Sequence, residues 1–182
     1  LGVPYGLEHP PPPADYGAMV KRVTEGLGCR LMFEPGRLIV ANAGILVTRV
    51  IYVKPSANKF FVITDAAMND LIRPTLYGAH HQVSPVLQSR NDGTPKTIDI
   101  VGPVCETGDI LAENRDIPLP IADDLLVLRS AGAYAAVMAS TYNARPLVPE
   151  VMVRGATHAV VRERQTYDAL LATNALPNWL IP

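Results

Sequence analysis

The beginning of the chain carries a helix pattern followed by an apolar run. From residue 14 to residue 28, apolar side chains recur at the spacing of one helix face, at Tyr16, Met19, Val20, Val23 and Leu27. Gly28 follows this face, and glycine commonly ends a helix because it tolerates the left-handed conformation. The next residues, CRLMF at 29–33, have the character of a short buried strand. The pattern therefore predicts one helix–strand unit of an α/β layer.

From Leu38 onwards the pattern changes to the period of two that is typical of strands. Residues 47–54 alternate between the two faces of an extended chain. Further short apolar segments, separated by Pro, Gly, Asn and Asp, lie at 59–64, 96–102, 124–130, 150–155 and 157–163. Many short strands with such turns predict an antiparallel barrel or sandwich. Residues 131–140 are ambiguous because Ala and Met favour a helix, and residues 164–174 predict a short closing helix.

Composition and charge narrow the class of protein. Apolar residues make up 48% of the 182 residues and charged ones 18%, which predicts a folded chain with a well-buried core. With 16 Lys and Arg against 17 Asp and Glu, no basic stretch favours nucleic acid or an acidic membrane surface as a partner. The longest apolar stretches are interrupted by Arg, Lys or Pro well short of a membrane span.

The cysteines and histidines give no sign of a metal site. Cys29 and Cys105 lack a CxxC spacing, and the four histidines form no HExxH pattern, so we expect no bound metal. Two free thiols suit a reducing compartment, which predicts a cytoplasmic location. The chain begins with Leu and a stretch rich in Pro and Gly, so we expect it to be a piece of a longer protein.

A Pro-Gly corner with charged ends lies where the helix–strand unit meets the β part. It consists of Glu34, Pro35, Gly36 and Arg37. One interpretation is a plain turn whose charged ends are solvated or paired with each other. The other is an anion site, in which Gly36 leaves its backbone N–H bare and the planar guanidinium of Arg37 binds phosphate or carboxylate. Ligand sites favour domain junctions, but the residues alone leave both interpretations open.

Three later segments contain side chains with possible chemistry. Arg73 and Tyr77 are four residues apart. In one interpretation they together offer two or three donors to one carboxylate; in the other, Arg73 belongs to a surface ion pair and Tyr77 is a half-buried tyrosine. Cys105 stands beside Glu106 in a Gly- and Pro-rich loop, where a thiol is either a small buried hydrophobe or a proton donor. Tyr134, between small residues, is either a core residue or a phenol that reaches a phosphate.

Taken together and in order, these segments resemble a known family. The motifs are EPGR (34–37), NDLIRPTLY (69–77), GPVCETGD (102–109), GAYAAVMASTYN (132–143) and RERQTYDALL (162–171). They are similar to diaminopimelate decarboxylase, a pyridoxal-phosphate enzyme of the alanine racemase-like class. The resemblance implies a mainly β chain. Residues 38–182 would be a C-terminal Greek-key antiparallel β-barrel domain, preceded at 1–37 by the last helix–strand piece of a TIM-type (β/α)8 barrel.

The resemblance also implies an activity and a role for each candidate residue. The reaction is the conversion of meso-2,6-diaminopimelate to L-lysine and carbon dioxide, the last step of lysine biosynthesis. The implied roles are cofactor binding by Glu34, Pro35, Gly36, Arg37 and Tyr134; substrate binding by Arg37, Arg73, Tyr77, Glu106 and Tyr134; and catalysis by Cys105. Glu34 would face the pyridine nitrogen, and Cys105 would return a proton to the α-carbon. A homodimer is implied, in which the Cys105–Glu106 loop acts in the partner's site.

The chain departs from the family at the lysine that binds the cofactor. None of Lys21, Lys54, Lys59 and Lys96 has the family's Y-x-x-K-A-N-like context, so we expect the 182 residues alone to be inactive. A related ornithine or arginine decarboxylase is an alternative, although a substrate without the second carboxylate would leave Arg73 unpaired. A non-catalytic barrel homologue that serves as a binding or regulatory subunit is a further alternative.

Overall fold

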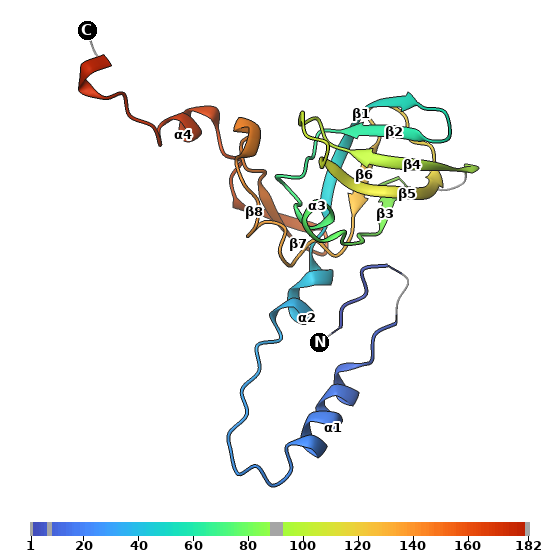
Figure 1. The fold of residues 1–182 in the computed structure, drawn as a ribbon, viewed down its shortest axis with the longest axis vertical. Coiled ribbons are helices and arrows are strands. Elements are labelled where there is room, and N and C mark those ends of the chain that lie inside the picture. Colours follow the sequence, from blue (N-terminus) through green and yellow to red (C-terminus); the bar gives the residue numbers. More distant parts are fainter. Residues whose placement is uncertain (1, 7–8, 88–92, 181–182) are drawn as a thin grey trace. The chain divides into compact units, whose positions relative to one another are not determined.

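The computed structural model describes residues 2–6, 9–87 and 93–180 (Figure 1). The chain divides into two compact units, Leu1–Met138 and Ala139–Pro182. The first contains a six-stranded sheet and the second a two-stranded one, so the expected predominance of β structure is confirmed. No helix in these ranges combines the length and the hydropathy that crossing a membrane requires.

The six-stranded sheet curls into a nearly closed barrel. Its order is β3 (Val83–Pro85), β6 (Leu125–Leu128), β1 (Leu46–Pro55), β2 (Phe60–Thr64), β4 (Pro95–Val101) and β5 (Ile110–Pro118). The first and last strands of this order, β3 and β5, also contact each other, which brings the edges of the sheet together. The barrel encloses the core, which contains the fully buried side chains of Val50, Val62, Leu71, Ile98, Ile100, Leu111, Leu126 and Leu128.

One strand pair departs from the expected antiparallel arrangement. Among the described strands, β2 and β4 run parallel, with Phe60 opposite Ile98 and Ile63 opposite Val101. Parallel neighbours need a long crossover connection. Here the crossover includes α3 (Arg73–Tyr77) and β3, which lies at the far end of the strand order. This crossover places α3 and the segment around it at one margin of the barrel, where the candidate residues gather.

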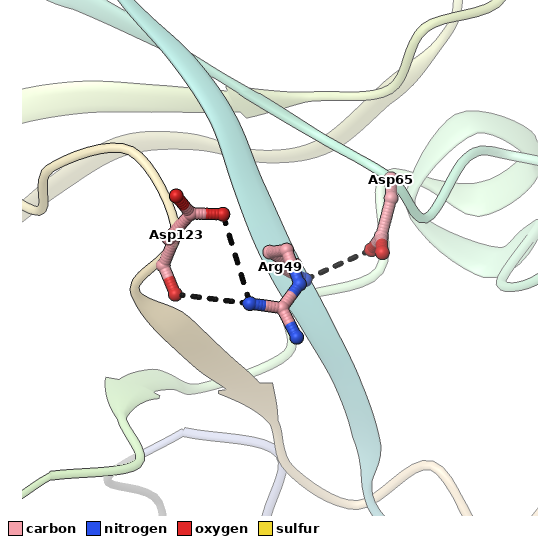
Figure 2. Close-up of polar contacts among 3 residues, drawn as sticks. All are labelled: Arg49, Asp65 and Asp123. Carbon is pink, nitrogen blue, oxygen red and sulfur yellow. Dashed lines mark hydrogen bonds and ion pairs between the residues drawn. The ribbon is translucent and has the colours of Figure 1, made fainter.

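The start of β1 follows the predicted alternation, and an acidic side chain fixes it in place. After Val50 the register shifts, so Tyr52 is exposed and Val53 packs against the core, contrary to the predicted pattern. Thr48 and Val50 are buried while Val47 and Arg49 are exposed. The buried Thr48 hydroxyl donates to Asp65 Oδ1 at 2.8 Å. The Arg49 backbone N–H donates to the same oxygen at 2.8 Å (Figure 2). The Arg49 guanidinium also meets Asp123 at 3.7 Å, but both of these side chains are largely exposed. Asp65 therefore links β1 to the end of β2.

The N-terminal segment forms the expected helix, which ends at Val23 and not at Gly28 as predicted, but it does not form the expected strand. The helix is α1 (Pro13–Val23), and its apolar face remains unburied, with Met19 and Val23 exposed. Residues 29–33 form no strand, so that part of the prediction is wrong. A strand is stabilised by pairing, and no strand of the described chain lies beside this run. Two short helical segments follow, α2 (Gly36–Val40) and η1 (Ala41–Ala43).

The second unit contains the two last predicted strands and the closing helix. The strands β7 (Glu150–Arg154) and β8 (Thr157–Arg162) form an antiparallel hairpin, and Gly155 in its turn has a φ of +58°. The helix α4 (Tyr167–Leu171) begins after Thr166, whose hydroxyl accepts from the Ala169 N–H at 3.1 Å. Short 3-10 turns, η3 (Tyr142–Ala144) and η4 (Asn178–Leu180), complete the unit. The hairpin is a separate sheet and adds no strand to the six-stranded one.

Candidate active site

The Glu-Pro-Gly-Arg corner is the start of a short helix rather than a plain turn. α2 begins at Gly36, directly after Pro35, and the side chains of Glu34 and Arg37 are exposed. The first N–H groups of a helix have no partner within the helix, so this corner offers backbone donors beside a guanidinium. A Cβ added at Gly36 would meet nothing within 4 Å, so the backbone there is open to close approach.

A tight backbone contact holds α2 next to the loop that carries Tyr134. The Gly132 N–H donates to the Ala41 carbonyl at 2.9 Å. A Cβ at Gly132 would overlap the Val40 carbonyl oxygen, so only glycine allows this approach. Gly44 contributes in the same way, because its own Cβ would collide with the backbone of Gly132. Two segments that are far apart in the sequence, and that both contain candidate residues, are thereby fixed side by side.

The Tyr134 loop has an unusual backbone. Tyr134 itself has a φ of +61° and Ser130 a φ of +58°, in the left-handed region that non-glycine residues seldom adopt. The Ser130 hydroxyl donates to Asn42 Oδ1 at 2.7 Å, which anchors the start of the loop. Strained residues persist where their surroundings fix them, and they concentrate at functional sites. Tyr134 remains 45% exposed, so its ring is available to a ligand.

Arg73 and Tyr134 are brought together, as the candidate site requires. Arg73 is only 8% exposed, and the carbon of its guanidinium lies 5.9 Å from the centre of the Tyr134 ring. Tyr5 approaches the same guanidinium at 4.4 Å. Another neighbour is His81, whose Nε2 lies 3.4 Å from Arg73 Nη1. Within the described ranges, no carboxylate forms an ion pair with Arg73.

His81 is completely buried, and its second ring nitrogen also has a hydrogen-bond partner. Its Nδ1 lies 2.9 Å from the backbone carbonyl oxygen of Arg129. The edge of the ring meets Tyr5, with the ring centres 5.3 Å apart and the planes at 76°. Burial is the main cause that lowers the pKa of His81 from its ordinary value of 6.5, and the positive charge of Arg73 adds to this effect. At neutral pH the imidazole is therefore uncharged.

The Cys105–Glu106 loop is stabilised by a buried carboxylate. Asp109 is 3% exposed and accepts two backbone N–H groups, from Val104 at 2.7 Å and from Met68 at 2.6 Å. These bonds tie both ends of the loop to the segment that precedes α3. Cys105 and Glu106 themselves are exposed at the tip.

The helix α3 contacts both groups of candidate residues, through different side chains. Arg73 points to Tyr5, His81 and Tyr134, whereas the Thr75 hydroxyl donates to the Gly108 carbonyl at 2.6 Å. Tyr77 is 65% exposed. The Cys105–Glu106 loop thus meets α3 at Thr75, whereas the Arg73 cluster surrounds a different side chain of the same helix.

A cleft of about 540 Å³ lies between α3 and β5. Its walls include Pro74, Thr75, Gly108, Leu111 and Arg115. None of the residues singled out from the sequence lines this cleft, so the candidate site and the cleft are different places. The groups of His, Cys, Asp and Glu that a metal ion needs are also absent from the described residues.

Sequence reasoning missed Tyr5, His81 and Asp109 as parts of the site. The sequence pattern of the histidines bears only on metal binding, and the position of His81 eight residues after Arg73 gives no sign of their contact. The second contact of His81 is with residue 129, and no local pattern reveals a partner so distant in the sequence. Asp109 carries a usable signal, because an Asp directly after a glycine-containing turn often accepts nearby backbone N–H groups. Tyr5 lies in a Pro-rich stretch that shows no periodicity.

Comparisons with known proteins agree with the resemblance seen in the motifs. The C-terminal sheet domain of pyridoxal-dependent decarboxylases matches residues 20–132. A diaminopimelate decarboxylase from Zymomonas mobilis is 54% identical over 99% of this chain and 42% of its own length. One from Pseudomonas aeruginosa is 50% identical over 97% of this chain and 42% of its own length. The chain thus spans about two fifths of the curated relatives that it matches.

Solved structures give the same result for the fold. The crystal structure of diaminopimelate decarboxylase from Helicobacter pylori complexed with L-lysine is 37% identical, with a TM-score of 0.84. The similarity covers 94% of this chain and 42% of that one. The nearly closed barrel, the ordered motifs and the matched residues all lead to one assignment. The chain belongs to the pyridoxal-dependent decarboxylase family, of which it carries the C-terminal sheet domain.

Proposed function

We propose that this chain is the C-terminal part of a pyridoxal-phosphate-dependent decarboxylase that converts meso-2,6-diaminopimelate to L-lysine and carbon dioxide. The observation that carries the proposal is the environment of Arg73. Its guanidinium is buried among two tyrosine rings and an uncharged histidine. The two relatives reported above are named diaminopimelate decarboxylases, and a similar structure was solved with L-lysine, which supports this choice of substrate.

A buried cation without an anionic partner is costly, by several kcal/mol for a fully desolvated charge. The cost falls when a carboxylate binds, and the planar guanidinium favours a carboxylate that approaches with both oxygens. Diaminopimelate has two carboxylates, of which only one leaves as carbon dioxide. We therefore assign the remaining carboxylate to Arg73, with Arg37 and Tyr77 as further donors from the adjoining segments.

The residues present fit pyridoxal phosphate by their donor chemistry. Glu34 supplies a carboxylate for the pyridine nitrogen, while Arg37 and the Tyr134 phenol supply donors for the phosphate. The open backbone at Gly36, after Pro35, allows the phosphate to come close. When bound, pyridoxal phosphate supplies the electron sink that makes loss of carbon dioxide from an amino acid feasible. The tight contact at Gly132 keeps the two halves of this donor set at a fixed separation.

We assign the proton-transfer step to Cys105 and recognition of the distal ammonium to Glu106. Cys105 is exposed at the loop tip, where its thiol can donate a proton to the α-carbon that has lost carbon dioxide. The loop packs on the Thr75 side of α3, and Arg73 is on the other side. This separation supports a homodimer in which the Cys105–Glu106 loop completes the partner's site.

We also propose the domain boundary and the location of the protein. Residues 1–37 would be the end of the cofactor-binding barrel and residues 38–182 the C-terminal β domain, because the strands begin only after α2 and η1. Cys29 and Cys105 are both exposed free thiols, the form that a reducing cytoplasm maintains. The 182 residues alone should not release carbon dioxide, because none of their lysines has the context of the cofactor lysine.

The test uses the full-length protein with pyridoxal phosphate, and measures carbon dioxide release from meso-diaminopimelate, ornithine and arginine. We expect activity only with diaminopimelate, and an increase in KM of at least about tenfold for Arg73→Ala, with partial recovery in Arg73→Lys. Preference for ornithine or arginine would replace the proposal with the related decarboxylases. No turnover of any substrate, together with unimpaired ligand binding, would favour a non-catalytic homologue.

A further inference from the structure

We propose that His81 is a positioning residue for Arg73. It acts as an uncharged hydrogen-bond acceptor that fixes the orientation of the guanidinium without neutralising its charge. This inference rests on the proposed function, because it concerns how Arg73 presents itself to the retained carboxylate of the substrate. It identifies a residue that never touches substrate and yet determines how strongly the carboxylate is bound.

The hydrogen bonds around the ring determine which nitrogen carries the proton. A backbone carbonyl oxygen is only an acceptor, so His81 Nδ1, at 2.9 Å from the Arg129 oxygen, must be protonated. In a neutral imidazole the other nitrogen then has a free lone pair. Arginine has only donors, so the 3.4 Å contact between Arg73 Nη1 and His81 Nε2 is a hydrogen bond donated by the guanidinium.

The ring cannot easily leave this arrangement. His81 has no exposed surface, and the Tyr5 ring contacts its edge. Rotation of the imidazole would break the bond to the Arg129 carbonyl and leave a buried donor and acceptor without partners. Losing partners in this way is costly for each buried group. The acceptor that Arg73 meets is therefore held in place by the fold rather than by the ligand.

An uncharged acceptor also preserves the affinity of Arg73 for an anion. A carboxylate in the place of His81 would pair with the guanidinium and compete with the carboxylate of the substrate. The tyrosine rings of Tyr5 and Tyr134 attract the cation only through their faces, which leaves the charge available. Two rings and one imidazole together orient the guanidinium, and none of them cancels its charge.

Two inhibitors separate this role from a purely structural one. When one centre of diaminopimelate loses its carboxylate, the product L-lysine retains the carboxylate that we assign to Arg73, whereas cadaverine lacks it. We compare His81→Leu and His81→Gln with the wild type in the full-length enzyme, using His158→Gln as a control at an exposed position of the second unit.

We expect His81→Leu to raise KM for meso-diaminopimelate and the inhibition constant for L-lysine by about tenfold, with little change in kcat or in inhibition by cadaverine. His81→Gln, which keeps an acceptor, should restore most of the loss, and His158→Gln should behave as wild type. An equal loss for L-lysine and cadaverine, or no loss for either, would overturn the positioning role.

A readout that needs no activity tests the same idea on the 182-residue chain. The nitrogen chemical shifts of the His81 ring should show a protonated Nδ1 and an unprotonated Nε2, and Arg73→Lys should shift the Nε2 signal. A proton on Nε2 instead would refute the assignment, even if His81→Leu fails to fold. If the wild-type enzyme does not decarboxylate diaminopimelate, the proposed function fails, whereas the ring measurement still decides the contact between His81 and Arg73.

Discussion

Replacing Asp109 by alanine tests how the Cys105–Glu106 loop is held. The carboxylate is 3% exposed and accepts the backbone N–H groups of Val104 at 2.7 Å and Met68 at 2.6 Å. The substitution removes both bonds and creates no alternative acceptor. It leaves two N–H groups unsatisfied, one in a buried bond and one in a partly buried bond.

The magnitude follows from these two bonds. Hydrogen bonds to a charged group contribute about 1.5–3 kcal/mol each, and an unsatisfied buried group costs about the same. We therefore expect Asp109→Ala to lower the free energy of unfolding by about 3–5 kcal/mol. Asp109→Asn retains one acceptor oxygen but turns an amide N–H toward a backbone donor, so it should lose roughly half as much. The size of the loss is large beside the total stability of a typical domain, about 5–15 kcal/mol.

The assay is urea unfolding followed by circular dichroism, combined with hydrogen exchange of the Met68 and Val104 amides. Both amides should lose protection in Asp109→Ala. The matched control is Asp116→Ala, because Asp116 is exposed and accepts the Thr97 hydroxyl at 2.7 Å. It should change stability by less than about 1 kcal/mol. Equal effects of the two substitutions, or unchanged protection of both amides, would show that the carboxylate does not hold the loop.

Three further outcomes follow from the structure. Gly132→Ala should lower the free energy of unfolding by about 2 kcal/mol or more, because the added Cβ would overlap the Val40 carbonyl oxygen. An unchanged midpoint of urea unfolding would contradict this close approach. Burial lowers the pKa of His81, so the unfolded chain binds a proton at this residue more readily than the folded chain. The free energy of unfolding should therefore be full above about pH 6.5 and fall as the pH drops below it. His81→Gln should flatten this pH dependence in urea titrations, and an equal pH dependence in both proteins would argue against the buried ring as the cause. Asp65→Ala should lower the free energy of unfolding by about 2 kcal/mol, and Asp123→Ala, at an exposed position, by less than about 1 kcal/mol. If thermal unfolding ranks the two variants in the opposite order, the contacts of Asp65 and Asp123 in Figure 2 do not have these roles.

The strands that obey a simple alternation could be predicted from the sequence, and those with interrupted patterns could not. β1 is predicted because its first half has the period of two, whereas the register shift after Val50 is not predicted. β5 is not predicted because four polar residues in a row, Glu113 to Asp116, interrupt the strand. Asn114 has a φ of +49°, and its N–H donates to Asp99 Oδ1 at 2.8 Å, so a local irregularity replaces the regular pattern there.

The candidate site shows a similar division. The motifs identified Arg73, Tyr134 and the Cys105 loop, since their residue types are distinctive in themselves. They gave no information about His81 and Tyr5, which matter only because the fold places them against Arg73. The apolar run at 29–33 illustrates the opposite error. Its composition suits a strand, but a strand exists only when a neighbour supplies hydrogen bonds.

The position of β1 in the strand order has a consequence for synthesis of the protein. β1 lies between β2, which follows it at once in the chain, and β6, which comes last among the barrel strands. While the chain emerges from the ribosome, β1 can pair with β2 early, but its other edge must wait until residues 125–128 have been made. An unpaired edge of this kind invites pairing with another nascent chain. The arrival of β6 is thus the event that closes the aggregation-prone edge.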